Sequence, residues 1–218
     1  MKILDALLDL LFPPRCPFCR KIGKRGVCAA CEAKLPYTEK PLREGAPFGK
    51  CAAPLYYEDA AREAILRYKF EGVSSMARDF APLIARCVSE ELAGEFDVVT
   101  WVPVSEKRLR SRGYDQAYLL AHETARLWDA KPVRLLKKCA DNPAQSSLSD
   151  ASARRANVLG MYDAVDGADI AGARILLIDD ILTTGSTLGE CVRVLRDSGA
   201  ASVVCAVLAM TRGEKKGS

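Results

Sequence analysis

One segment constrains this chain more than any other: residues 174–188 read R-I-L-L-I-D-D-I-L-T-T-G-S-T-L. Four apolar residues, typical of a buried parallel strand, lead into two adjacent acids. Ligands of open parallel sheets bind outside the carboxyl ends of the strands, so we expect Asp179 and Asp180 at the rim of a site. Their carboxylates can accept hydrogen bonds from the two neighbouring hydroxyls of a ribose.

The turn after the acids suits a phosphate. Thr183, Thr184, Gly185, Ser186 and Thr187 bring hydroxyls and backbone N–H groups to the start of a helix, where free donors and the helix dipole favour an anion. A helix cap alone needs a single hydroxyl, and four are present beside a pair of acids. No G-x-x-x-x-G-K-[ST] sequence occurs, which argues against a P-loop nucleotide site.

The chain as a whole predicts an α/β fold, a mostly parallel sheet flanked by helices, with a small N-terminal appendage. From about residue 53, helical and strand patterns alternate. We expect a helix and cysteine-rich appendage over 1–50, the α/β domain over 51–212 and a polar tail over 213–218. The polar stretch 139–157 is too long for an ordinary connection and is a candidate lid.

Basic residues form two clusters that could meet one polyanion. Arg108 and Arg112 belong to a run after residue 105, and Arg154 and Arg155 end the candidate lid. A guanidinium binds phosphate oxygens two at a time, which suits this role. For each single residue, a solvated surface charge is an equally good interpretation.

Four of the nine cysteines form two C-x2-C pairs, Cys16 with Cys19 and Cys28 with Cys31. Four thiolates complete a tetrahedral Zn²⁺ site without an open position, so we expect a structural zinc knuckle. The other assigned cysteines, Cys87, Cys191 and Cys205, lie in apolar patterns typical of a core. Cys51 and Cys139 have no assigned role.

Composition favours a soluble cytoplasmic protein. The odd cysteine count argues against a disulfide framework, and Asp5 and Asp9 interrupt the apolar run at the N-terminus, which is therefore interpreted as an amphipathic helix and not an export signal. No stretch approaches the roughly 20 apolar residues of a membrane span. A net charge of +4 suits an anionic ligand without demanding nucleic acid.

These motifs together resemble a known family. The 174–188 segment is similar to the phosphoribosyl pyrophosphate signature of type I phosphoribosyltransferases. With the cysteine pairs, L-R-Y-K-F, W-V-P-V, R-L-R-S-R-G-Y-D-Q-A and R-R-A-N, the chain resembles the ComF family over nearly its whole length. The resemblance implies that Asp179 and Asp180 bind ribose and that residues 183–187 bind its 5-phosphate. It also implies the substrate-binding residues Lys69, Pro103, Val104 and Ser105.

The resemblance leaves three functions open. The first is binding of phosphoribosyl pyrophosphate with Mg²⁺ and transfer of its phosphoribosyl group to an unidentified acceptor. The second is a competence or DNA-uptake factor that binds single-stranded DNA through the zinc knuckle and basic loops, with competence-machinery proteins or further copies of the chain as partners. The third is a ligand sensor. Asp115 stands where family members usually carry Asn, which puts a direct role of Asp115 with an anion in doubt.

Overall fold

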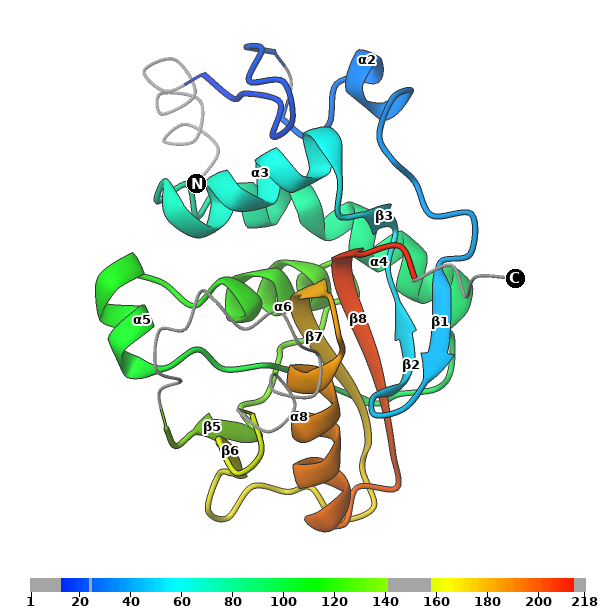
Figure 1. Cartoon of the computed structure of the whole chain (residues 1–218), viewed down its shortest axis with the longest axis vertical. Helices are drawn as coiled ribbons and strands as arrows, with labels where there is room; N and C mark the ends of the chain where they lie inside the picture. The colour runs from blue at the N-terminus through cyan, green and yellow to red at the C-terminus, as the bar shows by residue number, and fades with distance from the viewer. Residues whose placement is uncertain (1–12, 24, 141–157, 214–218) are drawn as a thin grey trace.

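The computed structural model describes residues 13–23, 25–140 and 158–213. Within these residues a six-stranded sheet forms the centre of the molecule, in the order β1-β2-β8-β7-β4, and β3 also pairs with β8 (Figure 1). Its strands are β1 (Leu42–Gly45), β2 (Gly49–Ala52), β3 (Leu55–Tyr56), β4 (Val98–Trp101), β7 (Arg174–Leu182) and β8 (Ser202–Met210). Only β1 and β2 pair antiparallel, so the mostly parallel sheet is confirmed.

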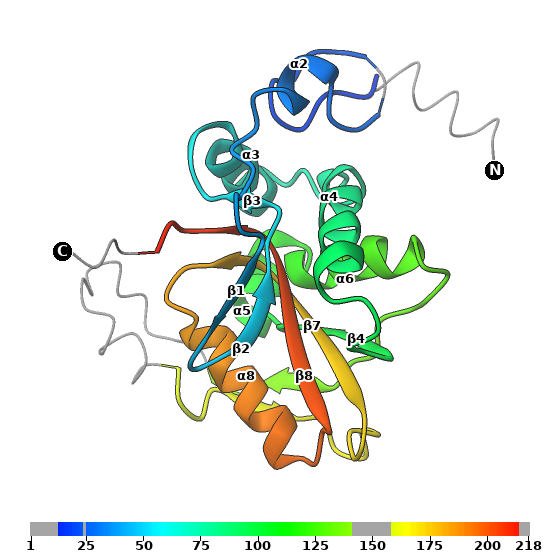
Figure 2. The same ribbon diagram turned by 90° about the vertical axis from the view of Figure 1, so that its right-hand side faces the viewer.

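Helices cover both faces of this sheet (Figure 2). One face carries α3 (Asp59–Phe70), α4 (Met76–Glu91) and α6 (Gln116–Arg126), and the other carries α8 (Ser186–Asp197). The central strands β7 and β8 are apolar along most of their length because both of their faces are covered. None of the helices in the described ranges is long and apolar enough to cross a membrane.

A smaller antiparallel sheet lies beside α8 and consists of β5 (Leu136–Lys138) and β6 (Tyr162–Ala164). The short helix α5 (Glu106–Arg112) begins at Ser105, whose hydroxyl accepts a hydrogen bond from the backbone N–H of Arg108, 3.3 Å away. Most of the candidate lid, residues 141–157, lies outside the described residues, and so does the expected N-terminal helix up to residue 12.

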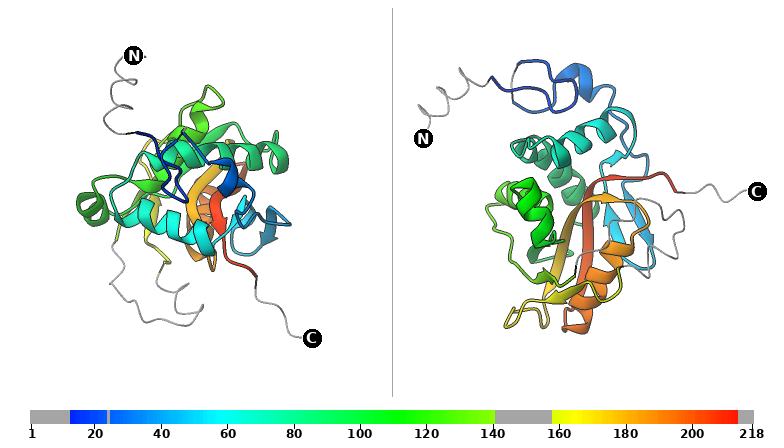
Figure 3. Two further views of the ribbon diagram at one scale, coloured as in Figure 1. Left: turned by 90° about the horizontal axis from the view of Figure 1, so that it is seen from above. Right: turned by 60° about the vertical axis from the view of Figure 1, so that its left-hand side comes forward.

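The cysteine-rich segment, which includes α2 (Ala29–Glu32), lies against α3 and α4 (Figure 3). The Arg67 side chain donates to the backbone oxygens of Pro17 and Phe18, at 2.6 and 2.9 Å. The Phe18 ring also packs on Phe80, with ring centroids 5.8 Å apart. The expected boundary near residue 50 falls inside β2, and the β1–β2 hairpin is part of the main sheet.

Candidate functional site

The parallel register of β4 and β7 brings two predicted loops to one edge of the sheet. Trp101 lies opposite Ile178, so residues 102–105 and the acids at 179–180 leave the paired region side by side. A pocket of about 290 Å³ opens at this edge. Nine of the residues predicted for the site line it: Lys69, Pro103, Val104, Arg108, Arg112, Asp179, Asp180, Thr183 and Thr187.

Four predicted residues do not line this pocket, and Arg154 lies outside the described residues. Ser105 uses its hydroxyl to cap α5. The hydroxyl oxygens of Thr184 and Ser186 are 2.9 Å apart and bond to each other. What the 184–187 turn offers a ligand is therefore its backbone N–H groups in the first turn of α8, together with the Thr183 and Thr187 side chains.

Gly185, the fourth of these residues, is required for a reason that the sequence did not reveal. Its φ of +76° is in the left-handed region, and a Cβ there would lie 2.4 Å from Cδ1 of Phe48. The glycine therefore accommodates the β1–β2 hairpin, which packs against the start of α8.

The two acids lie within β7 and not after its end. β8 continues to Met210 and keeps β7 paired as far as Leu182, so the strand runs past both acids. Adjacent residues of a strand point to opposite faces. Asp180 faces α3, where its carboxylate pairs with Lys69 Nζ at 2.8 Å, while Asp179 lies on the α8 side.

Burial changes the protonation behaviour of Asp179. Removal from water raises the pKa of Asp179 to about 8, and the nearby charge of Asp180 acts in the same direction. The ammonium of Lys69 opposes this shift without cancelling it. In the ligand-free site, burial therefore favours the protonated form of Asp179 at neutral pH.

Two arginines form the basic side of the pocket. Arg108 is exposed and extends from α5 toward the pocket. Arg112 is half-buried, and its Nη1 atom is buried without a hydrogen-bond partner among the described residues. A buried donor without a partner costs free energy that an anionic ligand would recover.

Four residues near the pocket were not identified as site residues from the sequence. The Asp115 carboxylate caps α6 and accepts from the backbone N–H of Val104, at 3.2 Å, and from Trp101 Nε1, at 3.3 Å. Burial raises the pKa of this carboxyl. Asp115 therefore orients the 102–105 loop, and an Asp just before a helical pattern is the signal that could have indicated this role.

The other three, Gln116, Lys138 and Tyr162, line the pocket itself. Lys138 Nζ donates to the Tyr162 hydroxyl at 3.2 Å, across the β5–β6 pair. No local motif marks Lys138 and Tyr162, because the strand pairing that joins them connects segments on either side of the candidate lid.

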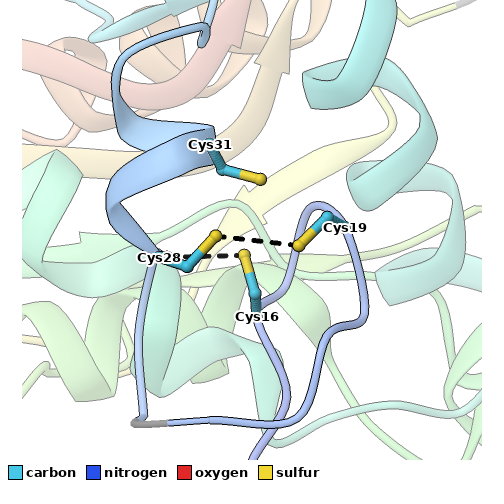
Figure 4. Close-up of side chains that lie close together, drawn as sticks. All are labelled: Cys16, Cys19, Cys28 and Cys31. Atoms are coloured by element: carbon cyan, nitrogen blue, oxygen red, sulfur yellow. Dashed lines mark hydrogen bonds between the residues drawn. The ribbon is translucent and has the colours of Figure 1, made fainter.

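The four cysteines of the knuckle come together as the sequence predicts (Figure 4). Their sulfur atoms all lie within 4.8 Å of one another, and those of Cys19 and Cys28 are 3.7 Å apart. Ligands of a tetrahedral zinc ion with Zn–S bonds of about 2.3 Å are separated by roughly 3.8 Å. The backbone N–H of Cys28 also donates to Cys16 Sγ, which favours the thiolate. The donor set and spacing fit a structural zinc ion.

The remaining cysteines are placed mainly in the core. Cys87, Cys191 and Cys205 are buried, as predicted. Cys51 is also fully buried, on β2 opposite Cys205 of β8, whereas Cys139 is exposed.

Comparisons with known proteins agree with this two-part organisation. Residues 116–218 match the family model described as phosphoribosyl transferase domain, and residues 7–63 match the model described as double zinc ribbon domain. The fold is therefore that of a type I phosphoribosyltransferase with an N-terminal zinc-binding segment, as predicted.

Two relatives and one solved structure illustrate the similarity. Competence protein ComFC of Bacillus subtilis is 27% identical over 190 residues, 87% of this chain and 74% of that protein. Competence protein F of Haemophilus influenzae is 27% identical over 215 residues, 87% of this chain and 93% of that protein. Glutamine phosphoribosylpyrophosphate amidotransferase from B. subtilis is 26% identical, with a TM-score of 0.42, and the match covers 61% of this chain and 26% of that one.

The chain thus spans about a quarter of the length of that solved enzyme, but most of the length of the two competence proteins. Both of its parts match family models in the expected order. This chain is a homologue of the ComF competence proteins, and its two parts match the double zinc ribbon and phosphoribosyl transferase domain models in that order.

Proposed function

We propose that the pocket binds phosphoribosyl pyrophosphate with Mg²⁺ and that the protein transfers the phosphoribosyl group to an acceptor. The observation that supports this most strongly is the grouping of an acid pair, a helix N-terminus and two arginines around one pocket. These three features match the hydroxyls, the 5-phosphate and the pyrophosphate of a single ligand.

Each part of the ligand has a counterpart in this arrangement. The 5-phosphate would accept from the backbone N–H groups of the 184–187 turn, where the dipole of α8 favours an anion. The ribose hydroxyls would donate to Asp179 and Asp180. The pyrophosphate would lie along residues 103–104, within reach of Arg108 and Arg112.

The same residues fit Mg²⁺. This ion is usually held by one or two carboxylates together with substrate phosphates, and Asp179 and Asp180 both line the pocket. When bound, it would neutralise charge that develops on the departing pyrophosphate. Lys69 and the two arginines add fixed positive charge on the same side, and Asp115 holds the 102–105 loop in place.

Calorimetric titration of phosphoribosyl pyrophosphate with Mg²⁺ into the zinc-loaded chain tests this proposal. We expect micromolar binding for the wild type and none for the Asp179→Asn, Asp180→Asn double variant. The matched control is the Asp163→Asn, Asp166→Asn double variant. It removes two exposed acids, one within β6 and one just after it, and should bind like the wild type. Equal binding by the wild type and the Asp179 and Asp180 variant would contradict the proposed site.

A second candidate function, binding of single-stranded DNA, is favoured by a separate groove. This groove, of about 750 Å³, lies between the knuckle and helices α3 and α4, and it is lined by four arginines: Arg15, Arg20, Arg25 and Arg67. Arg20 pairs with Glu71 at 2.6 Å and Arg67 holds the knuckle backbone, so both also have structural tasks. Relatives of the chain are named competence protein and DNA utilization protein, which supports a role with DNA.

Fluorescence anisotropy with an oligo-dT strand tests this second function. Binding through phosphate contacts should weaken steeply as salt rises, and the Arg15→Ala variant should reduce both the affinity and the slope. Salt-independent binding, or unchanged binding by the variant, would exclude this groove as the DNA site.

A further inference from the structure

The last turn of α3 contacts both the zinc knuckle and the pocket. Successive residues of a helix are turned by roughly 100°, so side chains four apart share a face and side chains two apart point to opposite sides. Arg67 and Glu71 contact the knuckle, where Arg20 pairs with Glu71 at 2.6 Å. Lys69, between them, reaches the pocket and pairs with Asp180 at 2.8 Å. This single turn therefore joins the two parts of the molecule.

Arg67 makes the most buried of these contacts with the knuckle. Its side chain is only 11% exposed, and it donates to the backbone oxygens of Pro17 and Phe18 at 2.6 and 2.9 Å. These two residues stand between Cys16 and Cys19, the first pair of cysteines in the knuckle. A buried cation without its acceptors is costly. The position of Arg67 therefore depends on the conformation of the loop between these two cysteines.

The conformation of this loop depends in turn on zinc. Small metal-binding segments take much of their folding free energy from the bound ion. Because Pro17 and Phe18 lie between two of the four cysteines, loss of the ion should free their backbone oxygens from Arg67. The knuckle can thus hold the end of α3 only while its own cysteines are held together.

A row of aromatic rings connects the same two regions. Phe18 packs on Phe80, with ring centroids 5.8 Å apart, and Phe80 packs on Tyr68, with centroids 5.7 Å apart. Tyr68 is fully buried, and its hydroxyl donates at 2.8 Å to the backbone oxygen of Gln116, a residue that lines the pocket. Packing against the knuckle thus extends to the residue that directly precedes Lys69 on α3.

We propose that the knuckle regulates the pocket through the end of α3. While the knuckle is folded around zinc, it holds Arg67, and Lys69 is kept beside Asp180, where its ammonium can meet an anionic ligand. When zinc is lost, this turn of α3 opens and Lys69 leaves its place, so phosphoribosyl pyrophosphate binds more weakly. Arg67 acts through Lys69 and is a positioning residue. This inference rests on the function proposed above and adds regulation to that same site.

The coupling has an expected size and a reciprocal consequence. Coupling between two sites commonly changes an affinity about 5- to 150-fold, and we expect loss of zinc to weaken phosphoribosyl pyrophosphate within this range. Linkage then requires phosphoribosyl pyrophosphate to tighten the binding of zinc by the same factor. Competition with a chromophoric zinc chelator, with and without the ligand, measures this second effect.

The reactivity of the Lys69 amine tests the coupling without any ligand. The zinc-loaded wild type, the Arg67→Met variant and the Cys28→Ser variant freed of zinc by a chelator are treated with an amine-acylating reagent, and modified lysines are quantified by mass spectrometry. The Lys69 side chain is 18% exposed and paired, so it should react slowly in the wild type. We expect it to react at least about 5-fold faster in both variants. The exposed Lys131 is the internal reference and should react equally in all samples.

Titration of phosphoribosyl pyrophosphate with Mg²⁺ into the same proteins, after removal of the chelator, measures the effect on the pocket. Arg67→Met and the zinc-free Cys28→Ser variant should bind about 5- to 150-fold more weakly than the wild type. Arg62→Met removes an exposed arginine of the same helix and should bind like the wild type. Hydrogen exchange of β7 and β8 should stay slow in every sample, and lost protection there would contradict a local effect and with it the proposal.

The remaining outcomes separate the regulation from the proposed function. Equal acylation of Lys69 in the wild type and both variants would refute the coupling, whether or not phosphoribosyl pyrophosphate binds. If the wild type and Arg67→Met bind the ligand equally, the coupling is refuted while the proposed function stands. If the zinc-loaded wild type does not bind phosphoribosyl pyrophosphate, the proposed function fails and its regulation fails with it.

Discussion

The protonated Asp179 makes a sharp prediction about stability. Burial raises the pKa of this carboxyl from 3.8 to about 8. Between these two values the unfolded chain has released the proton and the folded chain keeps it, so stability must fall as pH rises. Asp179→Asn replaces the neutral acid with a neutral amide of the same shape and removes this dependence. The advantage of the variant over the wild type in stability should therefore grow between pH 6 and pH 8.

The size of this pH-dependent change in stability follows from the surroundings of Asp179. One unit of pKa corresponds to about 1.4 kcal/mol, so the two pH units from 6 to 8 allow at most about 2.7 kcal/mol. Asp179 is only partly buried by accessible surface and lies near Lys69, so we expect roughly 1–2 kcal/mol, or about 3 to 6 °C in melting temperature for a chain of this length.

Melting curves of ligand-free, zinc-loaded protein at pH 6, 7 and 8 measure this difference. Comparing the wild type with the variant cancels the titrating groups that do not interact with Asp179, the cysteine ligands included. Asp166→Asn, at an exposed carboxylate with 96% of its side chain in solvent, is the control and should run parallel to the wild type. Parallel curves for Asp179→Asn and the wild type would refute the reasoning, because they would show that Asp179 is ionised throughout.

Three further predictions follow from the contacts around the pocket and the knuckle. Lys69→Met should destabilise the fold by about 3 kcal/mol in urea unfolding, because it leaves the buried Asp180 without its partner at 2.8 Å; a loss below 1 kcal/mol would contradict this pairing. Gly189→Ala should cost about 1–3 kcal/mol, although alanine normally favours helices, because its Cβ would lie 2.2 Å from Cγ of Pro47; a stabilised variant would contradict the contact. Cys28→Ser, or chelation of zinc, should increase hydrogen exchange over residues 16–31 and leave β7 and β8 protected, and unchanged exchange in the knuckle would contradict a zinc clamp.

Much of the fold could be predicted from the spacing of apolar residues in the sequence, because that spacing reflects which faces of each element are buried. The apolar run before Asp179 predicts a doubly covered strand, and the spacing of Phe80, Leu83, Ile84 and Val88 predicts α4, whose buried face they form. The end of β7 could not be predicted, because it depends on how far β8 continues beside it.

The elements that the sequence did not predict lie in segments whose composition is more typical of turns than of strands or helices. Pro41, Gly45, Pro47 and Gly49 give 41–50 the composition of a loop, yet it forms most of a hairpin that joins the sheet through β2 and β8. Strand β5 begins only at Leu136, because the preceding stretch bonds to β4 instead, from the backbone N–H of Val133 to the oxygen of Val99. Helix α5 was interpreted as a basic run, although Ser105 and Gly113 mark its two ends.

The candidate site likewise contains some residues that the local sequence identifies and others that depend on their neighbours in space. The acids and hydroxyls of residues 179–187 lie in one sequence segment, so their spacing could be recognised. Lys69 was identified only through the family resemblance. Gln116 could not be recognised, since an unpaired buried oxygen is defined by what surrounds it in space. Asp115, which the resemblance left in doubt as an anion ligand, acts instead on the loop beside the pocket.

The most direct test of the central claim is a crystal structure of the chain with phosphoribosyl pyrophosphate and Mg²⁺. We predict that the 5-phosphate lies at the backbone N–H groups of residues 184–187, that the ribose hydroxyls contact Asp179 and Asp180, and that the pyrophosphate reaches Arg108 and Arg112. An empty pocket at saturating ligand, or ligand bound in the arginine-lined groove beside the knuckle, would contradict the account.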